Sequence, residues 1–202
     1  LEAIHLSNTD IHLAGKACLK DLTLTIGGHA TRQQGFVTFE GEHTESYVSG
    51  AFLLTGKQHN DTRLVIDHAV PNCMSRELFK CVMDQAARGI FQGKAIVRRD
   101  AQKTDGNQSS HALLLSDESE FDAKPELEIY ADDVVCGHGA TSGDLDDNQL
   151  FYLRARGIPE TEAKSMLIGA FAAEAFDDVE SDAIRSVLSG LAEGWLARRK
   201  AG

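Results

Sequence analysis

The residues of this sequence best suited to chemistry are a cysteine and a histidine two positions apart, Cys136 and His138. If the stretch 134–138 is a β-strand, both side chains project from one face, because side chains alternate along a strand. A thiolate beside an imidazole suits zinc, copper or iron better than magnesium or calcium. A tetrahedral metal centre has four ligands, so the pair is half of a site whose other ligands must come from elsewhere, for example another chain. The alternative interpretation is structural: a buried thiol beside a hydrogen-bonded imidazole.

Glycines flank the histidine of this pair, and they would let another backbone or a bulky metal cluster approach closely. The other seven histidines have no neighbour at ligand spacing. The four cysteines form no Cys-x-x-Cys pair, which disfavours a zinc ribbon or a thioredoxin-type site. A chain of this length does not need disulfides, so we expect free thiols in a reducing cytoplasm.

Hydrolytic motifs are missing from the sequence: it contains no Gly-x-Ser-x-Gly elbow, P-loop or His-Glu-x-x-His. Three carboxylates, Asp132, Asp133 and Asp144, could serve a β-solenoid enzyme that acts on carbohydrate. Asp132 and Asp133 are adjacent, however, and would point to opposite faces of a strand. Such a stand-alone enzyme is the alternative to a scaffold or binding function.

Up to about residue 145, apolar and polar residues alternate over short segments, as they do in β-strands. These strands must position the candidate residues. The alternation is visible at 22–26, 36–39 and 64–66. An antiparallel sandwich and a solenoid of parallel strands compete, and only 27–28 and 105–106 resemble two-residue hairpin turns. We expect 101–110 to be a polar loop with an Asp-Gly turn. The scarcity of hairpin turns favours a solenoid, although no repeat of fixed period is visible.

The tail of the chain predicts three helical segments. Asp146 or Asp147 can cap the first and Gly157 can end it, whereas Pro159 suits the first turn of the second. The third begins near 177–178. The expected buried stripes are Ala163, Met166, Leu167, Ala170 and Phe171 in the second helix, and Ile184, Val187, Leu188, Leu191 and Trp195 in the third. The expected domains are 1–145 and 146–202.

Charge excludes some classes of partner. The 202 residues contain 20 Lys+Arg and 31 Asp+Glu, a net charge of −11, which argues against nucleic acid as the main partner. No apolar run approaches the roughly 20 residues that span a bilayer, so we expect no membrane insertion. The stretch 104–145 has one lysine and ten acidic residues, and is either a solvated face or a surface that meets a basic partner. The start at Leu1, without a signal-peptide pattern, suggests a trimmed cytoplasmic fragment.

Several stretches resemble the SufB/SufD family of iron–sulfur cluster assembly proteins, and its SufD branch more than its SufB branch. The resemblance is close over about 67–176 and looser over the first 60 residues. Family members are longer, so an N-terminal region would be absent here. The matching stretches are 67–68, 71–73, 77–80, 101–106, 113–116, 124–134, 136–141, 150–153, 156–158 and 170–171.

The resemblance implies a mainly β fold, a right-handed parallel β-helix followed by a C-terminal α-helical subdomain. It also implies a non-catalytic scaffold subunit that pairs with a SufB-type paralogue and docks a SufC-type ABC ATPase. His138 would then be a ligand of the nascent cluster at the interface with the paralogue, with Cys136 beside it. No cofactor would be tightly bound in isolation; iron or a nascent iron–sulfur cluster would be held in the assembled complex.

Two surfaces follow from the same resemblance. The subunit interface would include Val134, Val135, Gly137, Gly139 and Ala140, and the ATPase would dock on the helices at Phe151, Phe171 and Phe176. The end strands of a solenoid carry unpaired backbone groups that invite strand pairing. We therefore expect the chain alone to form a homodimer through the strand at 134–140.

Overall fold

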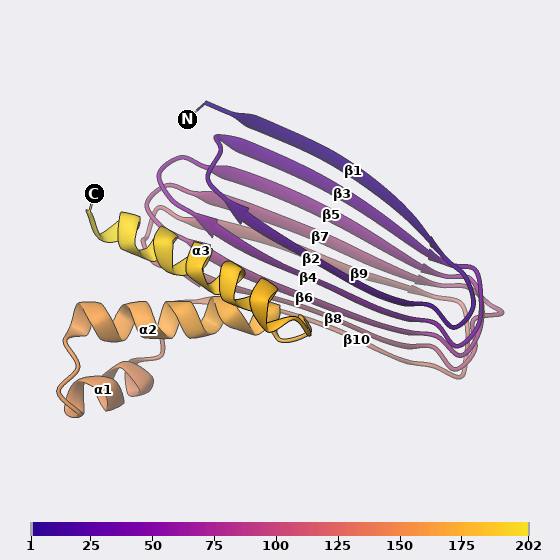
Figure 1. The fold of residues 1–202 in the computed structure, drawn as a ribbon. Helices are drawn as coiled ribbons and strands as arrows, with labels where there is room; N and C mark the ends of the chain where they lie inside the picture. The colour runs from indigo at the N-terminus through magenta and orange to yellow at the C-terminus, as the bar shows by residue number, and fades with distance from the viewer. Residues whose placement is uncertain (1, 202) are drawn as a thin grey trace.

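Ten long strands form the body of the molecule, followed by three α-helices and one 3₁₀ helix (Figure 1). These elements come from a computed structural model that describes the backbone of residues 2–201 and the side chains of residues 2–199. The strands are longer than the alternation in the sequence predicts. They are β1 (Ile4–Leu13), β2 (Cys18–Ile26), β3 (Ala30–Phe39), β4 (Glu45–Leu54), β5 (His59–His68), β6 (Met74–Met83), β7 (Arg88–Val97), β8 (Asp105–Leu114), β9 (Glu120–Ile129) and β10 (Val135–Gly143).

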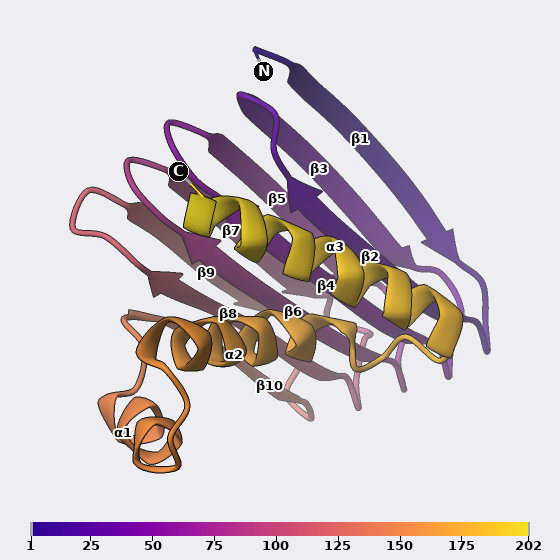
Figure 2. The same ribbon diagram turned by 60° about the vertical axis from the view of Figure 1, so that its left-hand side comes forward.

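The strands alternate between two sheets. Within the described residues one sheet has the order β1-β3-β5-β7-β9 and the other the order β10-β8-β6-β4-β2, and all neighbours are parallel. Each odd strand and the even strand after it therefore make one turn of a parallel β-solenoid, as Figure 2 shows from the side. The solenoid prediction is confirmed, and the antiparallel sandwich is excluded.

The repeat is hidden in the sequence because its length varies. Register partners on successive turns lie 26 residues apart for Ile4 and Ala30, but 32 apart for Arg88 and Glu120. The corners also vary: a left-handed residue stands in each odd-to-even turn from β1 to β8, and only two of the four, a histidine and an asparagine, are of types enriched in this conformation. These corner residues are Lys16, His43, Asn72 and Lys103, with φ between 57° and 62°.

Two expected turns differ in the structure. Residues 105 and 106 lie inside β8, so the predicted loop and Asp-Gly turn are wrong. The polar character of this segment arises because its inward-facing positions are Gly106, Gln108 and Ser110, which are buried. Gly27 and Gly28 do form a turn with φ of 85° and 74°, but it connects strands of different sheets rather than a hairpin.

Apolar side chains fill the space between the two sheets. Phe79 is central, with its ring centroid 4.2 Å from that of Phe91 and 5.8 Å from that of Phe52. Phe39, Ile66 and Met83 are fully buried in the same cluster. The core explains why even a variable repeat stacks in register, since each turn places its inward residues against those of the next.

The helices are α1 (Asp147–Ala155), α2 (Glu160–Ala173), η1 (Glu174–Phe176) and α3 (Asp182–Ala201). Asp146 caps α1: its side chain accepts hydrogen bonds from the backbone N–H of Asn148 at 2.7 Å and of Gln149 at 3.2 Å. Gly157 follows α1 with φ of 85°. Pro159 is the N-cap residue of α2, one position before the expected one. The ends of α1 and the start of α2 thus agree with the capping signals, whereas α3 begins at Asp182 and not near 177–178 as expected.

Helices α2 and α3 lie across the outer face of the even-numbered sheet (Figure 2). Ile168 and Trp195 pack there against Leu53, Val82 and Leu113 of β4, β6 and β8. Consequently β4 and β6 are buried on both faces over their C-terminal halves, whereas β5 and β7 alternate between buried and accessible positions. The expected division at 145/146 falls in the connection between β10 and α1.

The buried faces of α2 and α3 differ from the buried stripes that the sequence predicts. In α2 the buried residues are Ala163, Ile168 and Ala172, and Met166 is 48% exposed. In α3 the buried residues include Ala192, Trp195 and Leu196. Ile184, Val187 and Leu191 are at least half exposed, and they form an apolar stripe along α3 that faces away from the sheet. No helix among residues 2–201 is both long and apolar enough to cross a membrane.

Candidate metal centre at the last strand of the solenoid

Cys136 and His138 lie on β10, the edge strand of the even-numbered sheet. The register pairs Cys136 with Gly106 and His138 with Gln108 on β8. Gly106 and Gln108 are buried inward-facing residues, so their partners on β10 also project from the inner face. The strand begins at Val135, one residue later than the sequence predicts. The structure thus places the thiol and the imidazole side by side at the open end of the solenoid.

The cysteine and the histidine have different environments. Cys136 is partly buried against Val97 and Ala131, whereas His138 is exposed. Burial, with smaller contributions from the negative charges of Asp105 and Glu77, raises the pKa of the Cys136 thiol; a hydrogen bond from the Gly106 N–H opposes this. The thiol is therefore protonated at neutral pH, and a metal would have to displace its proton.

The pair has no third protein ligand close by. Among the described residues, no group of three or more His, Cys, Asp or Glu side chains could hold a metal ion. A Cβ added at Gly139 would meet nothing within 4 Å, and one at Gly137 would meet only Asn107 Nδ2 at 3.6 Å. Among residues 2–199 nothing therefore crowds the outer face of β10 at the two glycines, which is the face opposite to the thiol and the imidazole.

The free edge of β10 carries backbone groups of the same residues. The N–H of Val135 donates to the carbonyl oxygen of Thr104 at 2.9 Å. Because successive residues of a parallel strand turn to opposite sides, Gly137 and Gly139 also bond toward β8. The backbone groups of Cys136, His138 and Ala140 then point to the open edge. In the part of the chain that the structure describes, no strand pairs with this edge.

The carboxylates considered for carbohydrate cleavage do not converge. Asp132 and Asp133 precede β10, and Asp133 forms an ion pair with Lys103. Asp144 follows β10, so the whole strand separates it from the other two, roughly 30 Å at 3.3 Å per residue. Glycosidase carboxylates lie within about 10 Å of each other. The geometry does not support the carbohydrate-cleaving alternative.

Two buried polar residues near the candidate metal centre were not predicted from the sequence. Glu77 on β6 pairs in register with Gln108 on β8, the neighbour of His138. Both side chains are buried, and their oxygen and nitrogen atoms have no hydrogen-bond partner among the described residues. Burial raises the pKa of Glu77 to about 7, opposed in part by Ser75 and Arg76. The sequence did contain one indication: Glu77 is separated by even numbers of residues from Phe79, Cys81 and Met83, so it lies on the same inward face of β6 as these core residues.

The three phenylalanines expected to dock an ATPase lie in different environments. Phe151 on α1 is 74% exposed. Phe171 on α2 is partly buried, with the Lys80 ammonium 4.6 Å from its ring centroid. Phe176 in η1 is 1% exposed and packs beside Ala51. Phe176 is therefore part of the core beneath the helices and cannot touch a partner in this conformation.

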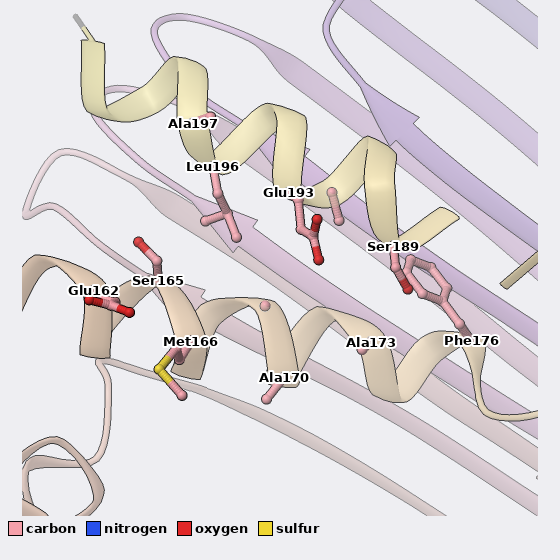
Figure 3. A pocket seen from close by; sticks show the side chains of 12 residues that line it. Glu162, Ser165, Met166, Ala170, Ala173, Phe176, Ser189, Glu193, Leu196 and Ala197 are labelled. Atoms are coloured by element: carbon pink, nitrogen blue, oxygen red, sulfur yellow. The ribbon is translucent and has the colours of Figure 1, made fainter. Parts of the chain in front are cut away.

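A groove of about 680 Å³ runs between α2 and α3 (Figure 3). Small side chains line it, including Ala170 and Ala173, together with Leu196. Two carboxylates, Glu162 and Glu193, also line the groove. The helices thus present an apolar groove that carries negative charge, on the face away from the solenoid.

A parallel β-solenoid with helices packed on its even-numbered sheet defines the fold class of this chain. Residues 1–171 match the family described as "SUF system FeS cluster assembly, SufBD core domain". The chain belongs to this SufBD family of iron–sulfur cluster assembly proteins.

Within the family, the chain is similar to the iron–sulfur cluster assembly protein SufD of Escherichia coli (strain K12). The two are 36% identical over 181 residues, which cover 90% of this chain and 43% of SufD. An iron–sulfur cluster assembly SufBD family protein of Mycobacterium tuberculosis (strain H37Rv) is 32% identical over 198 residues, covering 94% of this chain and 50% of that protein. The chloroplastic protein ABCI7 of Arabidopsis thaliana is 30% identical, covering 97% of this chain and 42% of that protein. The chain spans half or less of the length of these relatives.

Proposed function

We propose that this chain is a non-catalytic scaffold subunit of a SUF iron–sulfur cluster assembly complex, and that Cys136 and His138 supply half of the nascent cluster site. The observation that carries the proposal is their position: a thiol and an imidazole share the inner face of an edge strand whose other side is open. Iron accepts both ligand types, and the cluster is cargo rather than a resident group.

A SufB-type paralogue would complete the site. The free backbone groups of Cys136, His138 and Ala140 are suited to pair with an edge strand of a second solenoid, with Val134, Val135, Gly137 and Gly139 in the same interface. Such pairing would bring partner ligands to the edge of β10, next to the inner face that carries Cys136 and His138. Isolated chains would pair with themselves at this strand and form a homodimer.

A SufC-type ABC ATPase would dock on the helices. The surfaces available to it are the exposed ring of Phe151, the apolar stripe of Ile184, Val187 and Leu191, and the groove between α2 and α3. Phe171 and Phe176 would support this surface from beneath rather than touch the ATPase. ATP hydrolysis in the partner would then move the two solenoids relative to each other.

We also place the protein in the cytoplasm. Its four cysteines are all free thiols, and two of them, Cys73 and Cys81, are buried in the core. Free thiols are typical of a reducing compartment, where iron–sulfur chemistry also takes place.

Replacement of the imidazole tests the cluster role. We expect His138→Ala to fold normally, because His138 is exposed, and to lower cluster formation by the reconstituted complex. The loss should be at least about tenfold, since even residues that only orient a metal ligand are worth roughly 10- to 100-fold in affinity. The readout is the visible absorption of the cluster after anaerobic reconstitution with iron and sulfide.

The matched control is His29→Ala, which removes an exposed histidine at the turn between β2 and β3. Cluster formation by this control should equal that of the parent. Full cluster formation by His138→Ala would remove the imidazole from the proposed site.

Replacement of an exposed aromatic side chain tests ATPase docking. We expect Phe151→Ser to weaken binding to a SufC-type ATPase at least about fivefold, because a buried aromatic contact contributes strongly at interfaces. Binding is measured by size exclusion with light scattering and by calorimetry.

Leu6→Ser is the control, since Leu6 is 72% exposed on β1, away from the helices. It should bind like the parent. Equal binding by Phe151→Ser would move the docking surface off α1.

A further inference from the structure

Two rows of inward-facing residues run across β6, β8 and β10. One row is Ser75, Gly106 and Cys136, and the other is Glu77, Gln108 and His138. Neighbouring strands are about 4.8 Å apart, so Glu77 and His138 are separated by roughly 10 Å along the sheet. A buried carboxylate thus lies on β6, two strands away from the proposed metal half-site on β10.

Glu77 has no visible counter-charge. Glu77 is only 3% exposed, and both of its carboxylate oxygens lack a hydrogen-bond partner among the described residues. The neighbouring amide of Gln108 is also unpartnered at both atoms. An isolated buried carboxylate is costly, and such a group is stable only when it holds a proton or faces a cation.

The other titratable groups near Glu77 supply no internal cation. From β5 comes His68, whose pKa is lowered to about 4 by burial, so it is neutral. Cys81 on β6 and Cys73 just before it are buried thiols with raised pKa, and the guanidinium of Arg76 on β6 pairs with Asp105. Its register partners on β4 and β8 are Val48 and Gln108, neither of which is titratable.

β10 is the remaining neighbour, and Gly106 opens the way to it. A Cβ built on Gly106 would lie 3.5 Å from Ser75 Oγ and 3.6 Å from Cys136 Sγ. Because Gly106 has no side chain, the thiol of the edge strand and the hydroxyl next to Glu77 face each other across this gap. A charge placed at Cys136 and His138 would therefore act on Glu77 through the protein interior, where screening is weak.

We propose that Glu77 is the internal counter-charge of the metal half-site: in mildly acidic solution it holds a proton while Cys136 and His138 are empty and is ionised when they bind a cation. The inference rests on the proposed function and adds a regulatory group to it. In the step the Cys136 S–H bond breaks as the sulfur–metal bond forms, and the Glu77 O–H bond also breaks. Both protons leave to solvent, and nothing is oxidised or reduced. The raised pKa of Glu77, about 7, puts the change within reach of one nearby cation.

The test uses Cd²⁺ as the probe in a Cys18→Ser background, because Cys18 is an exposed thiol that would otherwise bind the metal. Ultraviolet absorption of the cadmium–thiolate bond reports binding at Cys136, with Cys136→Ser as the blank. Infrared difference spectra between metal-bound and metal-free protein report the carboxylic acid C=O band. The measurement is made at about pH 6.5, below the raised pKa.

We expect Cd²⁺ to remove one carboxylic acid band from the parent and from Glu118→Gln, a control at an exposed carboxylate. The change should be absent from Glu77→Gln. At about pH 8, where Glu77 is ionised in the parent, Glu77→Gln should bind Cd²⁺ about tenfold more weakly, the scale of an ion pair roughly 10 Å apart in a partly screened interior. Circular dichroism confirms that the isosteric variant folds.

Three results would overturn the proposal. The band could persist although cadmium–thiolate absorption forms, or the metal-free protein could show no Glu77 acid band at this pH. Absence of cadmium–thiolate absorption at Cys136 would remove the half-site itself and the inference with it, and this failure has a separate signature.

Discussion

At the scale of single residues, burial of Glu77 makes stability depend on pH. Its pKa is about 7 in the folded protein, against an ordinary value of 4.5. Below pH 4.5 the carboxyl is protonated in both the folded and the unfolded chain, so its ionisation does not affect the free energy of unfolding. As pH rises toward 7 the unfolded chain loses this proton first, so the folded state loses stability, and above 7 the penalty is constant at roughly 3 kcal/mol.

Glu77→Gln removes this penalty. We expect the variant to exceed the parent in free energy of unfolding by up to about 3 kcal/mol above pH 7, with the difference shrinking toward pH 4. Urea unfolding at a series of pH values measures it. A difference that does not change with pH would show that Glu77 is not a buried titrating group.

The residues of the candidate site differ in how far the sequence reveals them. Cys136 and His138 are two positions apart, so strand geometry alone places them on one face. Glu77 and Gln108 are 31 positions apart, and they meet only because one solenoid turn intervenes. No local pattern encodes that register, and the polarity of the segment around Gln108 predicted a loop rather than a core strand.

At the scale of elements, β10 combines a proposed binding site with an unprotected sheet edge. The N–H of Ala140 points away from β8, so proline at this position removes no bond within the solenoid but blocks pairing at the edge. We expect Ala140→Pro to turn the homodimer of the isolated chain into a monomer with little loss of stability. Light scattering at micromolar concentration measures the mass.

Thr141→Pro is the matched comparison. The N–H of Thr141 points toward β8, so proline there removes a ladder hydrogen bond. This variant should lose stability, by about 1 kcal/mol or more. A parent that is already monomeric would exclude the dimer through β10.

The elements were predictable to different degrees for physical reasons. Helix ends depend on local chemistry, which is why Asp146 and Gly157 mark α1 correctly. Strand ends depend on pairing with other turns, and the first half of β5, with the sequence His-Asn-Asp-Thr-Arg, has no apolar alternation. The buried faces of α2 and α3 were misplaced because both helices are apolar on more than one side, and only the sheet decides which side is covered.

At the scale of the whole molecule, the helices act as a second layer on the solenoid. Trp195 on α3 is 3% exposed and packs in the cluster that includes Leu53, Val82 and Leu113. We expect Trp195→Ala to lower the free energy of unfolding by about 3–5 kcal/mol. Chemical denaturation followed by far-ultraviolet circular dichroism measures the loss.

Val187→Ala is the control for this prediction, since Val187 is 63% exposed on the same helix. It should change stability by no more than about 0.5 kcal/mol. If both variants behaved alike, the helical layer would contribute little to the stability of the solenoid.

The topology of the molecule could not be derived from periodicity. Turns of 26 to 32 residues, with lysine, histidine and asparagine at left-handed corners, leave no constant spacing. Resemblance to a known family predicted the solenoid where pattern alone left two architectures open. The sequence located the acidic stretch at 104–145, and the structure shows that this stretch forms β8, β9 and β10 at one end of the solenoid.

The path of α3 has a mechanical consequence. The helix returns over the solenoid, so that the C-terminal end of α3 lies at the same end of the molecule as the start of β1 (Figure 1). Glu180, just before α3, contacts Lys20 of β2 at 2.5 Å, and Arg199 near the other end of the helix contacts Asp84 after β6. A force applied to the C-terminal end of α3 would have to break these two ion pairs before it reached the turns beneath the helix. Only then could the turns unwind one by one, each releasing about 100 Å of extended chain.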